Sequence, residues 1–185
     1  GYAAGQGFIR QPYSSSIPGG GIFKTSDAGE TWSAQTFGGI NFLVAIHFAN
    51  MNVGYAVGER GRIYKTVDAG GTWRLLDSVT ATTLRSVYFV SSDTGHIVGD
   101  DGIVLSTSDG GQSWNSQPTW SSLGLAYVTF TTPDTGFVIG AGGAMYRTVN
   151  GGKDWQYRRT GISNLVSSVY FATPTIGWAV GGGGA

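Results

Sequence analysis

The sequence predicts an all-β fold built from a repeated four-stranded unit, and three markers that share one period support this prediction. The first marker is a tryptophan that recurs every 41 residues, at Trp32, Trp73, Trp114 and Trp155. The second is Gly-aromatic-apolar-apolar-Gly, which occurs as GYAVG, GHIVG, GFVIG and GWAVG starting at 54, 95, 136 and 177. The third is a β-rich tetrapeptide that ends at Phe48, Phe89, Phe130 and Phe171. A fixed period of this length decides the architecture before any local pattern is considered.

Each unit contains four short β-rich runs, shown by AIHF (45–48), GYAVG (54–58), RIYKT (62–66) and TWRLL (72–76). Turn-type residues, with glycine where a positive φ is needed, separate these runs. Four strands of roughly 5 to 6 residues and four connections of about 4 residues fill about 40 residues, so no helix fits. A four-stranded antiparallel unit that repeats radially is a β-propeller blade, whereas a β-helix or a leucine-rich solenoid needs a shorter period.

The period divides the chain 1–185, a single propeller segment, into about four to four and a half blades. The expected units are 1–43, 44–84, 85–125 and 126–166, followed by a partial blade at 167–185. The opening GYAAG lies 53 residues before GYAVG, which indicates a twelve-residue insertion within 6–20. We expect about seventeen strands and an arc of a larger ring, since the final GWAVG would compete with GYAAG in a closed four-blade ring.

The composition argues against several partners. Lysine plus arginine equals aspartate plus glutamate, 11 each, so no net charge attracts nucleic acid or an anionic membrane. The chain has no cysteine, and no apolar run of about 18 residues that would insert into a membrane. Without an initiator methionine or signal peptide, the numbered chain is expected to begin after processing or truncation. Sparse charge, 12% of residues, is typical of secreted, periplasmic or cell-surface β proteins, so we expect an extracytoplasmic location.

The stretch before each marker tryptophan is a turn with a recurrent acidic or amide residue. The four copies are TSDAGETW, TVDAGGTW, TSDGGQSW and TVNGGKDW, and they contain Asp27, Asp68, Asp109 and Asn150. These side chains are expected to accept backbone N–H groups of their own turns, while glycine takes the left-handed corner. Each tryptophan is then expected to be buried between blades, which is worth about 3 kcal/mol. Calcium binding by the aspartates is less favoured, because the 41-residue spacing places them on separate blades.

These copies resemble the Asp-box of bacterial neuraminidase-type (BNR) repeats, Ser/Thr-x-Asp-x-Gly-x-Thr/Ser-Trp, with the fourth copy degenerate at Asn150 and Asp154. The longer phrase, from the strand before GYAVG to the tryptophan, is most similar to the propellers of photosystem II assembly and stability factors and their secreted bacterial relatives. This resemblance covers the whole chain. It implies a ring of typically seven blades, further blades of the same polypeptide, and a non-catalytic assembly or interaction scaffold.

No catalytic site is expected. A glycosidase needs two carboxylates in one pocket, or a Tyr/Glu couple with an arginine cluster in the case of a sialidase, and the carboxylates of this sequence are mostly assigned to turns. FIRQP (8–12) only faintly echoes a sialidase motif, and Arg10 is more simply an exposed loop residue. His47 and His96 lie in strands and are expected to be structural, and the final GGGGA lacks the Lys-Ser/Thr of a phosphate loop. We therefore expect no metal and no cofactor.

Strand alternation places the hairpins between second and third strands on the same face as the connections between blades, opposite the Asp-boxes. Basic and aromatic side chains gather there, which suits protein recognition. The residues expected to contact a protein partner are Phe8, Arg10, Tyr13, Arg60, Trp120, Arg158 and Arg159. The expected function is a non-catalytic scaffold. Two alternatives remain open: a fragment of a carbohydrate-active propeller, of sialidase or glycoside hydrolase type, and a purely structural array in a large surface protein.

Overall fold

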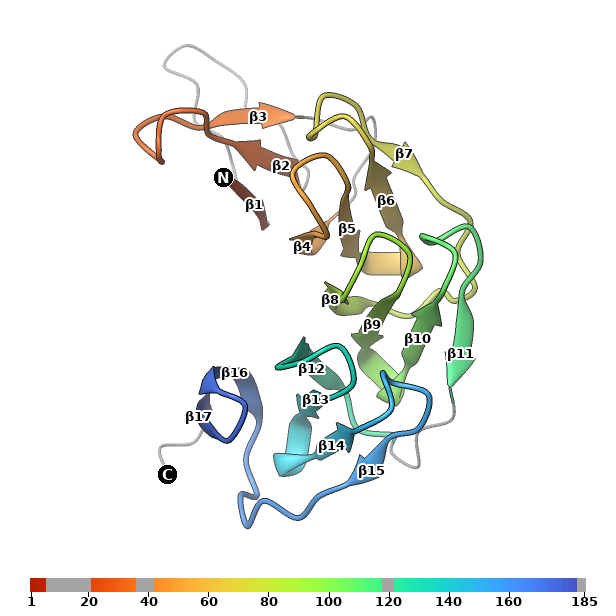
Figure 1. Cartoon of the computed structure of the whole chain (residues 1–185), viewed down its shortest axis with the longest axis vertical. Helices are drawn as coiled ribbons and strands as arrows, with labels where there is room; N and C mark the ends of the chain where they lie inside the picture. The colour runs from red at the N-terminus through yellow and green to blue at the C-terminus, as the bar shows by residue number, and fades with distance from the viewer. Residues whose placement is uncertain (6–20, 36–41, 118–121, 183–185) are drawn as a thin grey trace.

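The structure, a computed structural model, describes residues 1–5, 21–35, 42–117 and 122–182. These residues form antiparallel sheets arranged radially along an open arc, with the innermost strands β4, β8, β12 and β16 facing its hollow (Figure 1). The described part contains no helix beyond three-residue 3-10 turns, so the predicted all-β propeller architecture is confirmed.

Three of the sheets have four strands in chain order. The second blade consists of β4 (Leu43–Phe48), β5 (Gly54–Gly58), β6 (Ile63–Thr66) and β7 (Arg74–Leu75). The third consists of β8 (Leu84–Phe89), β9 (Gly95–Gly99), β10 (Val104–Thr107) and β11 (Asn115–Gln117). The fourth consists of β12 (Leu125–Phe130), β13 (Gly136–Gly140), β14 (Met145–Thr148) and β15 (Gln156–Tyr157).

The two ends of the arc carry shorter sheets. The first blade contains β1 (Tyr2–Gly5), β2 (Gly21–Lys24) and β3 (Ser33–Gln35), which correspond to strands two, three and four of the later blades. The last sheet contains β16 (Val166–Thr173) and β17 (Ile176–Gly181), which correspond to strands one and two. Each end therefore presents a sheet face that no other blade covers within the described residues.

The hydrophobic core lies between successive blades. One cluster joins Tyr55 and Ile63 of the second blade to Leu84, Phe89 and Trp114 of the third. At each of the four junctions, an aromatic ring from a second strand stacks on the phenylalanine at or near the end of the next blade's first strand. The stacked pairs are Tyr2–Phe48, Tyr55–Phe89, His96–Phe130 and Phe137–Phe171, with ring centroids 4.2, 3.6, 4.9 and 4.4 Å apart.

The two glycines of the Gly-aromatic marker are required by close packing within each blade. A Cβ on Gly95 would lie 2.5 Å from the ring of Phe89, and a Cβ on Gly99 would lie 2.2 Å from the carbonyl oxygen of Thr83. The same two contacts recur at Gly54 and Gly58, at Gly136 and Gly140, and at Gly177 and Gly181. A side chain at either position would force the first two strands of the blade apart.

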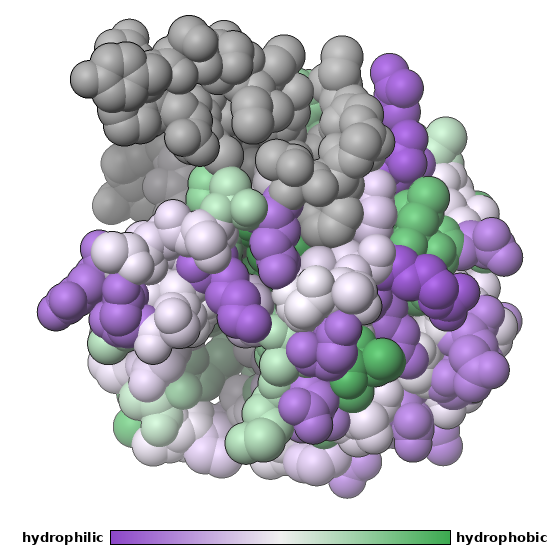
Figure 2. Space-filling view, turned by 90° about the horizontal axis from the view of Figure 1, so that it is seen from above, coloured by the Kyte–Doolittle hydropathy of each residue, from purple (hydrophilic) through white to green (hydrophobic). Residues whose placement is uncertain are grey.

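The described part of the surface shows no single-character face in the view of Figure 2. In the coloured part of the face seen in Figure 2, hydrophilic and intermediate residues predominate and hydrophobic residues are scattered among them. In the described part of the chain, no helix has the length and apolar character needed to cross a bilayer.

Candidate functional site

The hairpins between second and third strands form one face of the arc, which we call the turn face. Each hairpin is a 3-10 turn: η1 (Glu59–Gly61), η2 (Asp100–Gly102) and η3 (Ala141–Gly143). The first residue of each turn donates its backbone N–H to the connection that enters the same blade, with N–O distances of 2.9 Å to Phe42, Thr83 and Gly124. The connections that leave the second and fourth blades also pack here: a Cβ on Gly61 would lie 1.9 Å from the carbonyl oxygen of Thr80, and Thr160 Oγ1 donates to the carbonyl of Gly143 (3.1 Å). The predicted grouping of hairpins and connections on one face is therefore confirmed.

The middle residue of each turn has left-handed backbone geometry. Arg60, Asp101 and Gly142 have φ values of 57°, 56° and 64°. A left-handed conformation is disfavoured for arginine and aspartate by roughly 1 kcal/mol relative to glycine. The turn nevertheless keeps Arg60 and Asp101 at its exposed tip, where glycine stands in the fourth blade. Ala28 and Ala69 in the Asp-box turns have the same geometry, so backbone strain does not distinguish the two faces. The turn face is the candidate site because its tips carry the exposed charged side chains of Arg60 and Asp101.

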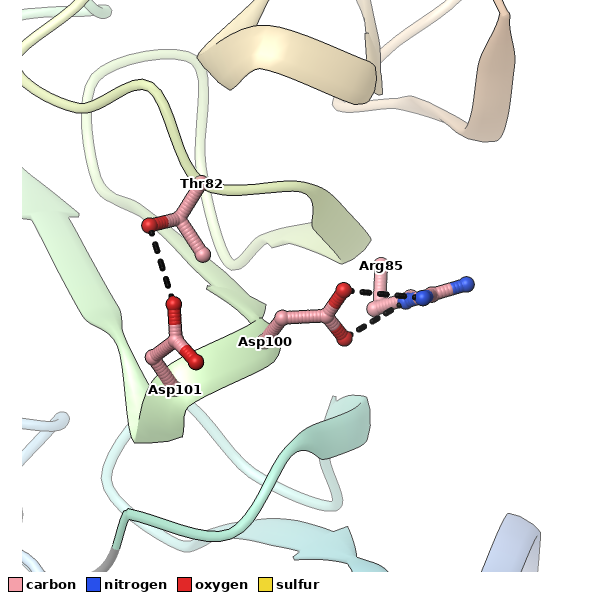
Figure 3. A network of polar contacts seen from close by, with 4 residues as sticks. All are labelled: Thr82, Arg85, Asp100 and Asp101. Atoms are coloured by element: carbon pink, nitrogen blue, oxygen red, sulfur yellow. Dashed lines mark hydrogen bonds and ion pairs between the residues drawn. The ribbon is translucent and has the colours of Figure 1, made fainter.

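A charged network occupies the centre of the turn face. Arg85, near the start of β8, donates Nε and Nη2 to the two carboxylate oxygens of Asp100, both at 2.8 Å (Figure 3). The bidentate Asp100 carboxylate raises the pKa of Arg85. Both side chains are exposed, 46% and 38%, so the pair orders the surface but contributes little to stability. Asp101 points the other way and receives a long hydrogen bond, 3.5 Å, from Thr82 Oγ1.

Arg85 and Asp100 are not among the residues that the sequence analysis expects to contact a partner. Arg85 is the extra residue of a β-bulge, since Leu84 pairs with Gly99 and Ser86 with Val98, and its side chain reaches Asp100 just beyond the end of β9. The residues that the sequence predicts to contact a partner fall into two groups: three that the structure describes and four that lie outside the described residues. Arg60, Arg158 and Arg159 are exposed, with Arg60 on the second blade and the other two after the fourth, so they do not form one cluster. Phe8, Arg10, Tyr13 and Trp120 lie outside the described residues.

The Asp-boxes lie on the opposite face and act as turns. In the second box, Asp68 Oδ1 accepts the backbone N–H of Thr72 (2.8 Å) and the hydroxyl of Thr66 (2.7 Å). Asp27 and Asp109 accept the equivalent two hydrogen bonds in their own boxes. These hydrogen bonds lower the pKa of all three carboxyl groups. No three His, Asp or Glu side chains of the described ranges gather as metal ligands would.

The expectation that all four box tryptophans are buried is wrong. Trp114 is 6% exposed, Trp73 and Trp155 are half-buried, and Trp32 is 48% exposed. The reason is that each ring packs toward the preceding blade: Trp73 Nε1 donates to Gln35 (3.0 Å) and Trp155 Nε1 to Gln117 (2.9 Å). Trp32 is in the first blade, and no described residue precedes that blade to cover its ring.

The histidines are both packed at blade junctions. His96 is 2% exposed and stacks on Phe130, and its burial lowers its pKa to about 4 against the opposing effect of the Gly151 backbone. His47 Nδ1 accepts the backbone N–H of Phe89 (3.3 Å), and burial lowers its pKa too. Neither ring is placed beside a carboxylate in a way that prepares it for acid–base chemistry.

The sequence and fold of this chain are similar to those of several known proteins. The family model described as "Photosynthesis system II assembly factor YCF48" matches residues 39–126. Among solved structures, "YCF48 bound to D1 peptide" is 31% identical, with a TM-score of 0.57 over 62% of this chain and 39% of that chain. The chain is a BNR-type β-propeller similar to YCF48. No curated protein sequence matches it.

Other propellers extend the comparison. YCF48 from Cyanidioschyzon merolae is 25% identical, with a TM-score of 0.58 over 66% of this chain and 41% of that chain. The GH74 enzyme of Niastella koreensis is 18% identical, with a TM-score of 0.61 over 76% of this chain and 26% of that chain, and at this identity it shows the fold alone. The propeller spans about two fifths of the length of both YCF48 structures.

Proposed function

We propose that this chain is a non-catalytic protein-binding propeller, an interaction or assembly scaffold that engages a polypeptide partner through the turn face. The observation that carries this proposal is the 31% identity to a structure of YCF48 bound to a D1 peptide. The turn face supports it, since Arg60 and Arg159 are exposed there. Arginine is enriched at protein interfaces, where its guanidinium group binds acceptors bidentately.

The chemistry of the described carboxylates argues for binding rather than catalysis. A glycosidase acid needs a raised pKa and a second carboxylate at a defined distance. The pKa values of Asp27, Asp68 and Asp109 are instead lowered by their own turns, and Asp100 is paired with Arg85. The likeness to GH74 enzymes adds nothing to an enzymatic proposal, because it extends to the fold alone.

The test is fluorescence anisotropy with a labelled D1 peptide and charge-reversal variants of the chain. Arg60→Glu, and separately Arg158→Glu with Arg159→Glu, are expected to weaken binding at least about tenfold, or 1.4 kcal/mol. Arg74→Glu is the matched control, because Arg74 is an exposed arginine of β7 beside the second Asp-box. That variant is expected to bind within about twofold of the parent chain.

Three outcomes contradict the proposal. Absence of saturable peptide binding argues against the scaffold function and favours a purely structural array. Equal weakening by Arg74→Glu indicates nonspecific attraction and removes the turn face from the proposal. Release of reducing sugar from β-glucans, or of sialic acid from sialosides, by this chain shows that it is an enzyme.

We also propose an extracytoplasmic location for the parent protein. The supporting observation is compositional: only 12% of residues are charged, the chain has 32 glycines, and no cysteine is present. Fractionation of the source cells with an antibody against this chain tests the proposal. Detection in the secreted, periplasmic or surface fraction is expected, and recovery in the cytosol alone contradicts it.

A further inference from the structure

The innermost strands of successive blades contact one another through a residue that recurs every 41 positions. In the second blade this residue is His47, whose Nδ1 accepts the backbone N–H of Phe89 (3.3 Å) and whose ring centroid lies 4.6 Å from that of Tyr88. In the third blade it is Tyr88, whose hydroxyl donates to the carbonyl of Phe130 (3.3 Å) and whose ring stacks on Phe130 at 5.6 Å. An aromatic ring thus fills the space between the innermost strands at both of these junctions.

At the junction between the fourth blade and the last sheet, the recurring residue is Thr129, which has no ring. The strand that faces it, β16, keeps the groups that the two rings bind at the earlier junctions. Phe171 has the same pairing register in its hairpin as Phe130 has in the preceding blade, so its N–H and C=O point to the free inner edge of β16. No side chain of the described residues forms a hydrogen bond with either group.

A pocket of about 290 Å³ lies between these two strands, which line the hollow of the arc (Figure 1). Its volume is just below the roughly 300 to 1,000 Å³ of small-molecule sites, which suits a single ring. Tyr170 is 69% exposed and Thr129 is half-buried, so a group that arrives from solvent reaches both side chains. The residues that line the pocket include Tyr127, Thr129, Thr131, Tyr170, Phe171 and Thr173.

We propose that this pocket binds the side chain of a tyrosine from a polypeptide partner, which supplies the ring that Thr129 lacks. The phenol hydroxyl donates to the carbonyl of Phe171, as the hydroxyl of Tyr88 donates one junction earlier. The ring lies against Tyr170, as the histidine of the second blade lies against Tyr88. A phenol hydroxyl is both a donor and an acceptor, so it matches the C=O and the N–H that Phe171 presents.

The pocket favours a tyrosine that is part of a polypeptide. Its rim is exposed at Ala172, Thr173 and Pro174, so the backbone that carries the ring stays in solvent. Tyrosine is enriched at protein interfaces because its ring is apolar and its hydroxyl is polar. The pocket lies on the Asp-box side, since Gly151 of the fourth box donates its N–H to Asp134 in the turn after β12 (2.9 Å). This side is opposite the turn face, so the tyrosine site does not depend on the peptide binding proposed there.

The test is NMR of the threonine methyl groups during titration with N-acetyl-tyrosinamide. The signals of Thr129, Thr131 and Thr173, which line the pocket, are expected to shift saturably. The signal of Thr148, which is buried in the fourth Asp-box, is expected to stay unchanged. N-acetyl-phenylalaninamide, which lacks the hydroxyl, is expected to bind at least about fivefold more weakly.

A capped Ala-Tyr-Ala peptide distinguishes the two sources of a phenol ring. Binding at least as tight as that of N-acetyl-tyrosinamide supports a polypeptide partner. Exclusion of the peptide overturns the proposal in favour of a free phenolic compound.

Three variants complete the experiment. Thr129→Tyr fills the pocket with the ring of the earlier repeat and is expected to weaken binding more than about tenfold, read at Thr131 and Thr173. Tyr170→Ala removes an exposed stacking partner and is expected to weaken binding about fivefold, and it serves if Thr129→Tyr fails to fold. Val67→Tyr adds the same ring at an exposed position of the second Asp-box and is expected to change nothing.

Four results overturn the proposal. They are shifts that fail to saturate, shifts that Thr148 shares, binding that persists unchanged in both Thr129→Tyr and Tyr170→Ala, and equal affinity for the phenylalanine compound.

Discussion

The indole nitrogen of Trp114 has no hydrogen-bond partner, although the residue is 6% exposed. In the neighbouring boxes the corresponding nitrogens donate to Gln35 and Gln117, which end the outer strand of the preceding blade. Leu76 occupies this position before Trp114, so its apolar side chain packs in the core and leaves the N–H unpaired. The replacement of glutamine by leucine at this repeat position thus exchanges a hydrogen bond to the indole nitrogen for apolar contact in the core.

This difference predicts that the two reciprocal substitutions, Gln117→Leu and Leu76→Gln, lower the free energy of unfolding by unequal amounts. Gln117→Leu is expected to cost about 1 to 3 kcal/mol, because Trp155 Nε1 loses its acceptor and the Gly152 carbonyl loses its donor. Leu76→Gln is expected to cost less, since the hydrogen bond gained by Trp114 offsets the apolar burial lost. Urea denaturation followed by far-UV circular dichroism measures both, and a larger loss for Leu76→Gln contradicts the reasoning.

His96 makes the stability depend on pH. Burial lowers its pKa from 6.5 to about 4, so the folded chain binds fewer protons than the unfolded chain between these values. Its contribution is complete above about pH 6.5 and is lost as the pH falls toward 4, a decrease of about 3 kcal/mol. The Asp-box carboxyl groups have pKa values lowered from 3.8, so their contribution to stability is lost at a pH below the range in which His96 titrates.

His96→Phe removes this dependence, because phenylalanine stands at the same repeat position in Phe137 and stacks on Phe171. The free energy of unfolding of the variant is expected to fall less steeply between pH 6.5 and 4 than that of the parent chain. His47 remains in both proteins and supplies the residual slope. Parallel pH profiles from urea denaturation at several pH values would argue against the assigned role of His96.

At the scale of the element, the fourth Asp-box exchanges its charged and neutral positions. Asn150 Oδ1 accepts the backbone N–H of Asp154 (3.1 Å), as Asp109 accepts that of Ser113 (3.0 Å). The second contact is reversed, since Asn150 Nδ2 donates to Asp154 Oδ2 (2.9 Å), whereas Ser113 Oγ donates to Asp109 Oδ2 (2.6 Å). The turn therefore needs one acceptor and one donor, and either position can supply the carboxylate.

Asn150→Asp places two carboxylates in hydrogen-bond contact without a donor between them, and is expected to destabilise the chain by about 1 kcal/mol at neutral pH. Adding Asp154→Ser rebuilds the third box and is expected to recover most of that loss. The double-mutant cycle in urea denaturation measures the coupling. Additive losses would show that the two positions do not interact.

At the scale of the whole molecule, the place of a blade along the arc decides the burial of identical repeat residues. Trp114 lies between two four-stranded blades and is buried, whereas Trp32 at one end is 48% exposed and Trp178 at the other is 59% exposed. Trp178 occupies the slot from which Tyr55 stacks on Phe89, and Tyr170 of the same sheet is 69% exposed. Both end faces therefore present aromatic side chains that interior blades cover.

This difference predicts unequal costs for one chemical change. Trp114→Ala is expected to cost about 3 to 5 kcal/mol through the cavity it leaves between two blades. Trp32→Ala is expected to cost less than about 1 kcal/mol, because much of its ring contacts solvent in the folded chain. Urea denaturation followed by far-UV circular dichroism measures the free energy of unfolding of both variants. Similar losses for the two variants would contradict the observed difference in burial.

The sequence alone determined the repeat, the four strands of a blade and the turn chemistry of the Asp-boxes, because these depend on neighbouring residues and on a period visible along the chain. The paired glycines around each aromatic position belong to the same local pattern. The tertiary structure alone decided which repeat residues meet across a junction. It showed that Trp32 is exposed, that Arg85 pairs with Asp100, and that His96 is buried against Phe130. These outcomes depend on contacts between blades, where the same residue type is buried, paired or exposed according to what the adjacent blade places against it.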